Sequence, residues 1–331
     1  MNKYILVAAT VTLALISILT SCENRLEFDF GTKDSRFVIN ALLNADSINN
    51  EVYVSYTDPY QATPANDAIV KVYVNGDLKE TVDQSETINN NVGAKYPIHC
   101  KFKVNDLVKI DVSTKENTKH AWAEVKVLPP TPIEKIEVSP KEYVNVVLGY
   151  KKHFQFKITI NDHSQGEDYY YRLVPESYIR TKEGAIRVGS KNEVHYQLEK
   201  RIAMYLDNDF VLMDGNPITS NDNQNTAIST VYNYYGVFSN KLFKDQSYTL
   251  NISIPTFYHL DNVIIRLLRI SKQEYNYFKA INTIDSDIFG DEFCEPVIFD
   301  TNVNGGLGIV AISSESSQKI QIMNPKEEIY D

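Results

Sequence analysis

The sequence lacks the motifs by which catalytic and metal-binding sites are usually recognised. It contains no His-Glu-x-x-His, no Cys-x-x-Cys and no nucleophile elbow. The glycine-rich run at residues 305–308 has neither the lysine nor the Ser/Thr of a phosphate-binding loop, so we expect a tight turn or bulge there. The six histidines are scattered without metal-ligand spacing: His99, His120, His153, His163, His195 and His259. These absences favour a protein with no catalytic residues, cofactor or metal, although a His/Asp/Ser set assembled by folding stays open.

Basic residues are fewer than acidic ones. The chain has 33 Lys and Arg against 43 Asp and Glu, and its formal net charge is −10 at pH 7. An acidic protein repels phosphate backbones, which argues against nucleic acid as a partner. The same repulsion argues against adsorption to anionic lipid, so any membrane attachment must come from acyl chains.

Cysteine is scarce, with three residues in the chain. Beyond Cys22, which belongs to the N-terminal segment, only Cys100 and Cys294 remain. In an oxidising compartment these two could form a disulfide that ties the N-terminal region to the C-terminal region. Two unpaired, buried cysteines are the alternative.

The N-terminus has the layout of a bacterial lipoprotein signal peptide. Lys3 precedes a mostly apolar run over residues 4–19, and small residues then lead to Cys22. A transmembrane anchor is the alternative, but a spanning helix needs roughly 20 apolar residues and this run is shorter. We therefore expect residues 1–21 to be removed as a signal peptide, Cys22 to be lipidated, and residues 22–35 to form a tether.

Residues 36–128 show the pattern of closely spaced short strands. The strand at 37–43 is expected to be buried on both faces, whereas 51–56 and 68–74 alternate as half-buried strands do. Asn75-Gly76 predicts a type I′ hairpin, because this turn needs positive φ at both central residues. Further strands are expected at residues 97–104, 107–113 and 121–128. This region is predicted to be a β-sandwich of immunoglobulin-like or transthyretin-like type.

A proline-rich junction at residues 129–132 precedes a second β-rich domain, residues 133–331. Proline stops a β-ladder and stiffens the chain, so a domain boundary is expected there. The second domain is predicted to be sandwich-like, with one α-helix near 271–285. Ser271 and Glu274 form the capping-box pattern at its start, and its apolar stripe is expected to pack into a core.

Tyrosine is abundant, with 22 residues against one tryptophan. Tyrosine favours strands, but it also favours surfaces that bind sugars or peptides, because it combines an apolar ring with a polar tip. The candidates for such a ligand surface are Tyr53, Tyr56, Tyr60, Tyr169 and Tyr171. Neighbouring strand residues point to opposite faces, so at least one face of the 169–171 cluster is expected to be core.

Two acidic loops, at residues 161–168 and 207–214, carry enough oxygen ligands to raise the question of calcium. Neither has the register of an EF-hand loop. We expect ordinary turn hydrogen bonding in both and no metal site.

Several of these features together resemble an uncharacterised family of Bacteroidota outer-membrane lipoproteins, domain of unknown function 4249. The segments that carry the resemblance are the lipobox ending at Cys22, the strands at 37–43 and 68–76, the junction 129–132, the helix start 271–278, and Glu295-Pro296-Val297 with Asn302 and residues 304–309. Members are often encoded beside TonB-dependent receptors, which implies an accessory role in nutrient uptake. The family has no established active site and therefore transfers no functional residues.

The resemblance and the anchor imply a lipoprotein of the outer membrane, on the cell surface or the periplasmic face. We expect a non-catalytic binding module, accessory to a TonB-dependent receptor, whose ligand the sequence does not name. A structural or adhesive surface protein is the alternative from another class. A hydrolase with a concealed site is a third.

Overall fold

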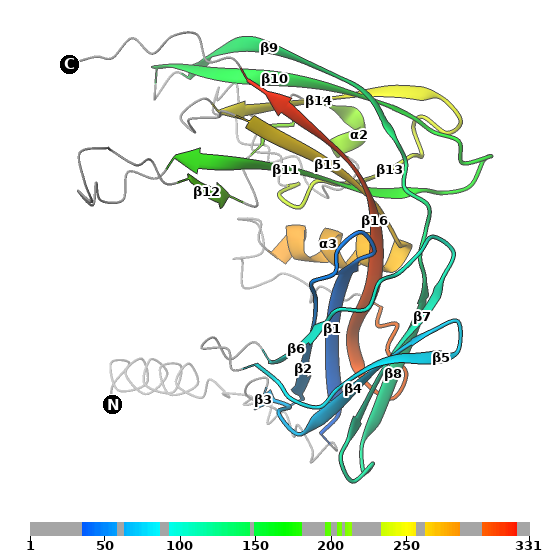
Figure 1. Ribbon diagram of the computed structural model, residues 1–331. Coiled ribbons are helices and arrows are strands. Elements are labelled where there is room, and N and C mark those ends of the chain that lie inside the picture. Colours follow the sequence, from blue (N-terminus) through cyan, green and yellow to red (C-terminus); the bar gives the residue numbers. More distant parts are fainter. Residues whose placement is uncertain are drawn as a thin grey trace, which may run out of the picture. The chain divides into compact units, whose positions relative to one another are not determined.

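The computed structural model describes residues 35–57, 63–86, 93–145, 149–180, 196–199, 204–206, 209–213, 233–255, 262–284 and 300–322 (Figure 1). Within these ranges the chain is built mainly of β-strands, as predicted, with two helices. The signal peptide, Cys22 and the tether as far as residue 34 lie outside the described residues.

The first eight strands form two layers that share one core. The strands are β1 (Phe37–Asn44), β2 (Asn50–Tyr56), β3 (Thr63–Pro64), β4 (Ala68–Val74), β5 (Asp77–Val82), β6 (Ala94–Ile98), β7 (Leu107–Thr114) and β8 (His120–Lys126). One layer has the order β5-β4-β7-β8, and β1, β2, β3 and β6 belong to the other. Their inward side chains, such as Ile39, Val54, Val72 and Ile110, form one buried cluster. This is the sandwich arrangement that the alternating strands predict.

The hairpin between β4 and β5 is confirmed. Asn75 and Gly76 have φ angles of 53° and 88°, and Val74 pairs with Asp77 across the turn. Both central residues therefore have the positive φ that a two-residue type I′ turn requires.

Strand β1 differs from its prediction because only one of its faces is buried. Phe37, Ile39 and Leu43 point into the core, whereas the alternate residues Asn40 and Asn44 are partly exposed. Leu42, on the same outward face, is 40% exposed. The outward face of β1 is therefore partly exposed.

The second group of elements again has two β-layers around a core. Its elements are β9 (Ile133–Asn145), β10 (Gly149–Asn161), β11 (Tyr170–Arg180), β12 (Tyr196–Glu199), α2 (Phe210–Met213), β13 (Val237–Ser239), β14 (Ser247–Pro255), β15 (Asn262–Ile270) and α3 (Lys272–Ile284). The sheet β14-β10-β9 packs its apolar side chains, such as Phe156 and Ile252, against Leu173 and Leu267 of β11 and β15. The second β-sandwich-like arrangement is thus consistent with the prediction.

The predicted helix near 271–285 is α3. The backbone N–H of Glu274 donates to Ser271 Oγ over 3.1 Å, which is the N-cap hydrogen bond that the sequence predicts. Tyr275 and Phe278 pack into a buried cluster with Tyr170 and Ile270, so this part of the apolar stripe is core. The four-residue helix α2, capped by Asp209, is an addition to the single helix predicted.

The last strand, β16 (Leu307–Gln321), joins both groups of strands into one sheet of order β12-β11-β15-β16-β1-β2-β3. Its first half pairs parallel to β1, and its second half pairs antiparallel to β15. Figure 1 shows this long strand running from β1 to β15. The boundary at residues 129–132 stays a prediction, but the C-terminal strand contributes to the sheets on both sides of it.

Glycine is required where β16 begins. Gly308 has a φ of +102°, and a Cβ there would lie 2.2 Å from the backbone oxygen of Ile39 in β1. The side chain of Asn302 also bonds both backbone groups of Val310, with distances of 2.6 and 2.9 Å. Gly308 therefore allows a close backbone contact between β16 and β1, and the predicted turn is at Gly305, which has a φ of +75°.

Candidate functional site

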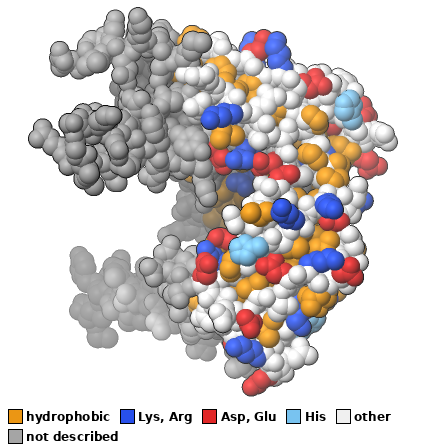
Figure 2. All heavy atoms as spheres, viewed as in Figure 1, with side chains coloured by type: hydrophobic (Ala, Val, Ile, Leu, Met, Phe, Trp, Pro, Cys, Tyr) orange, Lys and Arg blue, Asp and Glu red, His pale blue; other side chains and the backbone are white. Residues whose placement is uncertain are grey.

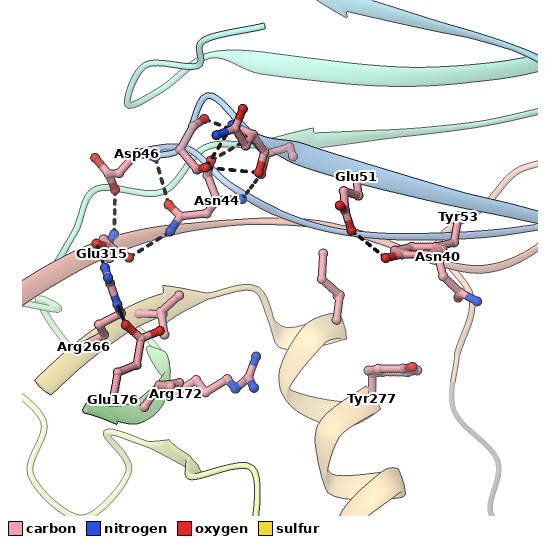
Figure 3. Close-up of a pocket in the computed structure, with 16 residues that line it drawn as sticks. Asn40, Asn44, Asp46, Glu51, Tyr53, Arg172, Glu176, Arg266, Tyr277 and Glu315 are labelled. Atoms are coloured by element: carbon pink, nitrogen blue, oxygen red, sulfur yellow. Dashed lines mark hydrogen bonds and ion pairs between the residues drawn. The ribbon is translucent and has the colours of Figure 1, made fainter. Parts of the chain in front are cut away.

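A cavity of about 920 Å³ lies on one face of the long sheet, where β1, β2, β11, β15 and β16 come together with α3 (Figure 3). Its volume is within the range of small-molecule sites, roughly 300–1,000 Å³. The lining residues are Asn40, Leu42, Asn44, Asp46, Ser47, Asn49, Asn50, Glu51, Tyr53, Arg172, Val174, Glu176, Arg266, Leu268, Tyr277 and Glu315.

The period-two alternation of strands places these side chains together. In β11, Leu173 is buried in the core, so Arg172 and Val174 point to the opposite face. In β15, Leu267 faces the core and Arg266 and Leu268 face the cavity. The same alternation in β1 and β2 brings Asn40 and Tyr53 to the cavity face, where they are register partners.

One end of the cavity, which we call the arginine end, is a bridged set of charges around Arg266. Its Nε donates to Glu176 over 2.7 Å and its Nη1 donates to Glu315 over 2.5 Å. Asn44 Nδ2 donates to the other oxygen of Glu315 over 2.8 Å, and the backbone N–H of Glu315 donates to Asp46 over 2.9 Å. Burial disfavours the charge on Arg266, but the bonds to the two carboxylates raise its pKa overall. The side chains of the arginine end therefore hold one another in place through these hydrogen bonds.

The other end, which we call the tyrosine end, is built around Tyr53. Its hydroxyl donates to Glu51 Oε2 over 2.5 Å, and Lys95 forms an ion pair with Glu51 Oε1 over 2.9 Å. Burial and the hydrogen bond to the Glu51 carboxylate raise the pKa of Tyr53 to about 12, so the phenol is neutral at physiological pH. Figure 3 shows Asn40 beside Tyr53, and Tyr277 of α3 in the same part of the cavity.

Arg172 connects the cavity to α3, whose Tyr277 lines the same cavity. Its guanidinium carbon lies 4.1 Å from the ring centroid of Phe278, and its Nε donates to the backbone oxygen of Tyr235 over 3.3 Å. Phe278 in turn stacks on Tyr235 with ring centroids 5.0 Å apart. These contacts hold Arg172 against the middle of α3, where a cation–π interaction with Phe278 stabilises its charge.

Glu274, in the first turn of α3, is buried although it is a carboxylic acid. It is 3% exposed, and its Oε2 has no hydrogen-bond partner among the described residues. Burial raises the pKa of Glu274 to about 7, and the positive charge of Arg172 only partly offsets this effect. The Ser271 half of the predicted capping box is formed, whereas no described hydrogen bond leads from the Glu274 carboxyl back to Ser271.

The structure separates the tyrosines that the sequence grouped. Tyr53 lines the cavity, but Tyr56 packs on the core side, stacked on Phe37 with centroids 5.1 Å apart. Tyr60 lies outside the described residues. Of the two described candidates in the first sandwich, Tyr53 lines the cavity and Tyr56 does not.

The prediction of a ligand surface at Tyr171 is wrong. Tyr171 is 0% exposed and stacks on Phe238 in the core, with its hydroxyl donating to Asp162 over 3.2 Å. Tyr169 is partly buried against the same core. The guanidinium carbon of Arg269 lies 3.0 Å from the centroid of the Tyr169 ring. Because Tyr170 packs against α3, both faces of this cluster serve packing.

Cys100 has a half-buried free thiol in this structure, and burial raises its pKa. Cys294 and Cys22 lie outside the described residues. The disulfide between Cys100 and Cys294 and the lipidation of Cys22 stay predictions.

The acidic loop at residues 161–168 is a hydrogen-bonded turn. Asp162 is 3% exposed, and its carboxylate accepts from Ser164 over 2.5 Å, Asn240 over 3.0 Å and the backbone N–H of Asp245 over 2.8 Å. Across the part of the chain that the structure describes, no group of three or more His, Cys, Asp or Glu side chains is arranged to hold a metal ion. The oxygens of Asp162 are thus engaged by protein donors. Asp207, Asn208 and Asp214 of the second acidic loop lie outside the described residues.

On the face seen in Figure 2, acidic, basic and hydrophobic side chains are interspersed over the described surface, without a broad basic patch. None of the helices formed by the described residues is long and apolar enough to cross a membrane.

Most of the residues that line the cavity were not predicted from the sequence. Arg172, Glu176, Arg266 and Glu315 were not singled out, although each is a charged residue inside or beside an apolar strand. Charges at alternate positions of β11 and β15 indicate an outward face, but an ordinary solvent-exposed strand face has the same pattern, so the sequence alone does not distinguish the cavity.

Comparison with solved structures finds two crystal structures of the β-glucuronidase of Parabacteroides merdae, one of them with glycerol in its active site. The sequence identities are 10% and 9%, and the TM-scores are 0.23 and 0.22. The similarity covers 72% of this chain but only 23% and 24% of the enzyme chains. TM-scores this low assign neither fold nor function.

No curated protein matches the chain. Residues 23–319 match the family model of a domain of unknown function, DUF4249. This match covers most of the chain, and the protein therefore belongs to the DUF4249 family.

Proposed function

We propose that this protein is a non-catalytic binding module and that the cavity between the arginine end and the tyrosine end is its ligand site. The observation that carries the proposal is the bridged polar lining around Arg266, Glu176 and Glu315 on one face of the long sheet. We further propose that acylated Cys22 anchors the module to the outer membrane, where it serves a TonB-dependent receptor.

The lining is organised before any ligand arrives. Arg266 is held by two carboxylates, Glu315 by Asn44 as well, and Tyr53 by Glu51. Groups that are already fixed lose little conformational entropy when a ligand binds, so more of the contact energy appears as affinity. A prearranged polar surface of this kind supports a binding role.

The state of the carboxylates favours binding over acid–base catalysis. Glu176 and Glu315 both accept from Arg266, and Glu51 accepts from Lys95 and Tyr53. A general acid or base must be able to exchange a proton with its substrate, whereas these carboxylates are engaged by protein donors. This pairing supports the absence of a catalytic role.

The proposed lipid anchor and the proposed receptor partner are both inferred from the sequence. The apolar run ending at Cys22 supports acylation, and a net charge of −10 leaves acyl chains as the means of attachment. The resemblance to the lipoprotein family supports an association with a TonB-dependent receptor. A ligand site on the part of the chain beyond the tether is what an accessory protein of nutrient uptake requires.

The experiment is an affinity purification of the full-length, C-terminally tagged protein from detergent-solubilised envelopes of the native bacterium. We expect a TonB-dependent outer-membrane barrel to co-purify, and an unrelated tagged lipoprotein from the same envelopes to be the control. Recovery of the protein without a barrel, or with the same proteins as the control, would overturn the accessory role.

A further inference from the structure

We infer that the ligand of this cavity is an uncharged, hydroxyl-rich compound of the saccharide class. The inference rests on the proposed function, because it names the class of ligand that the proposed site takes. Four features of the lining lead to it: its charge, its hydrogen-bonding groups, its apolar strip and the strands beneath it.

The charge of the lining argues against anions. Four acidic residues line the cavity against two arginines: Asp46, Glu51, Glu176 and Glu315 against Arg172 and Arg266. Arg266 is bridged by two carboxylates, and Arg172 lies against the ring of Phe278. Phosphates, sulfates and uronates would therefore meet an excess of negative charge.

The same pairing argues against a cationic ligand. Glu176 and Glu315 share Arg266, Glu51 is paired with Lys95, and Asp46 accepts the backbone N–H of Glu315. A ligand ammonium would have to share these carboxylates with Arg266, Lys95 and the backbone N–H, so it would gain less than at an unpaired carboxylate. A neutral ligand is the one that leaves every pair intact.

The remaining polar groups suit hydroxyls. Asn40 makes no side-chain hydrogen bond among the described residues, and its amide offers both donors and acceptor lone pairs. Next to it, the Tyr53 oxygen donates to Glu51 and retains acceptor capacity. A sugar hydroxyl both donates and accepts, so adjacent amide and phenol groups match it in both directions.

An apolar strip completes the match. Leu42, between Asn40 and Asn44 in β1, lines the cavity together with Val174 and Leu268, and Tyr277 adds an aromatic ring. A saccharide ring has a C–H face as well as hydroxyl edges, and it buries that face against aliphatic and aromatic side chains. A wholly polar lining would not favour such a ring over water.

The strands beneath the cavity argue against an extended peptide. Peptides commonly bind by adding a strand to a free sheet edge. Here β11, β15, β16, β1 and β2 are interior strands in the order of the long sheet, although β16 pairs with β1 only over residues 307–313 and with β15 only over residues 314–321. The cavity lies on the face of these interior strands and not at the outer edge of the sheet, so recognition there relies mainly on side chains, as it does for a compact saccharide.

The test uses the full-length lipidated protein, purified in detergent and applied to an array. The array carries neutral oligosaccharides, their uronate and sulfated counterparts, and neutral peptides. We expect binding to at least one neutral oligosaccharide. Binding confined to charged glycans, binding confined to peptides, or no binding at all would each overturn the inferred ligand class.

Variants locate the binding in the cavity. Asn40→Ala and Tyr53→Ala should each weaken binding of the strongest array glycan by roughly tenfold, the loss expected for about one hydrogen bond with its packing. Tyr73→Ala is the matched control, because Tyr73 is a half-buried tyrosine on the outer face of β4 that does not line the cavity. Equal losses in Tyr53→Ala and Tyr73→Ala, or no loss in either cavity variant, would overturn the assignment.

Failure of this inference is distinguishable from failure of the proposed function. If a TonB-dependent barrel co-purifies while no neutral glycan binds, the accessory role stands and the ligand class is wrong. If a neutral glycan binds in the cavity while no barrel co-purifies, the ligand class stands and the accessory role is wrong.

Discussion

Replacing Arg266 with methionine tests whether the arginine end holds the cavity together. The Arg266 side chain is 27% exposed, and those of Glu176 and Glu315 are 12% exposed. The variant removes two charge-assisted hydrogen bonds and leaves two partly buried carboxylates without their shared cation. Breaking a buried pair costs roughly 3–5 kcal/mol, and an exposed pair contributes about 0–1 kcal/mol. For this partly buried group we expect a loss of about 2–4 kcal/mol in the free energy of unfolding.

The assay is urea denaturation at pH 7, followed by far-ultraviolet circular dichroism. Lys79→Met is the matched control, because the Lys79–Asp77 pair is separated by 3.1 Å but its side chains are 45% and 76% exposed. The control should cost less than about 0.5 kcal/mol. A combined variant, Glu176→Gln with Arg266→Met and Glu315→Gln, should recover part of the loss, since the two carboxylates no longer lack a partner. A loss in Arg266→Met no larger than that of the control would show that the charges around Arg266 do not stabilise the fold.

Three further predictions concern the fold and the anchor. Gly308→Ala should lower the free energy of unfolding by more than about 2 kcal/mol, because its φ is +102° and its Cβ would lie 2.2 Å from Ile39 O; Gly76→Ala, with φ +88° and nothing within 4 Å, should cost clearly less. The pKa of Glu274 is raised by burial from 4.5 to about 7, so the folded state holds this proton more tightly than the unfolded state. Stability should therefore fall as pH rises from 4.5 to 7 by roughly 2–4 kcal/mol, and Glu274→Gln should remove this slope; an unchanged slope in chemical denaturation across these pH values would contradict it. Cys22→Ala should release the protein from membranes under carbonate wash, and a variant that stays in the membrane fraction would disprove the lipid anchor.

Local signals predicted the local structure well. Asn75-Gly76 requires only its own backbone geometry to specify the hairpin, and Ser271 requires only the backbone N–H of Glu274 to begin the helix. Such interactions span a few residues, so a sequence pattern contains all the partners that decide them.

Strand β1 shows where pattern reading failed. Phe37, Ile39, Ala41 and Leu43 alternate toward the core, but Leu42 fills one outward position and makes the run look apolar on both faces. Asn40 was the residue that indicated an outward face. The outward face carries Leu42 because it lines a cavity, and that role depends on strands elsewhere in the sequence.

The cavity itself could not be predicted from the sequence. Its walls come from β1 and β2 near the N-terminus and from β11 and β15 far along the chain, and β16 joins them by pairing with β1 on one side and β15 on the other. Parallel pairing between strands so distant leaves no local signature. Tyr171 was misplaced for a related reason, since only the β14-β10-β9 sheet opposite it shows that its face is core.

A crystal structure of this protein with a bound neutral oligosaccharide would locate the ligand site. We expect the sugar ring against Leu42, Val174 or Leu268, with its hydroxyls within hydrogen-bond distance of Asn40 and Tyr53. A glycan that binds in solution but occupies another surface in the crystal, such as the outward face of β8 with Trp122, would show that this cavity is not the ligand site.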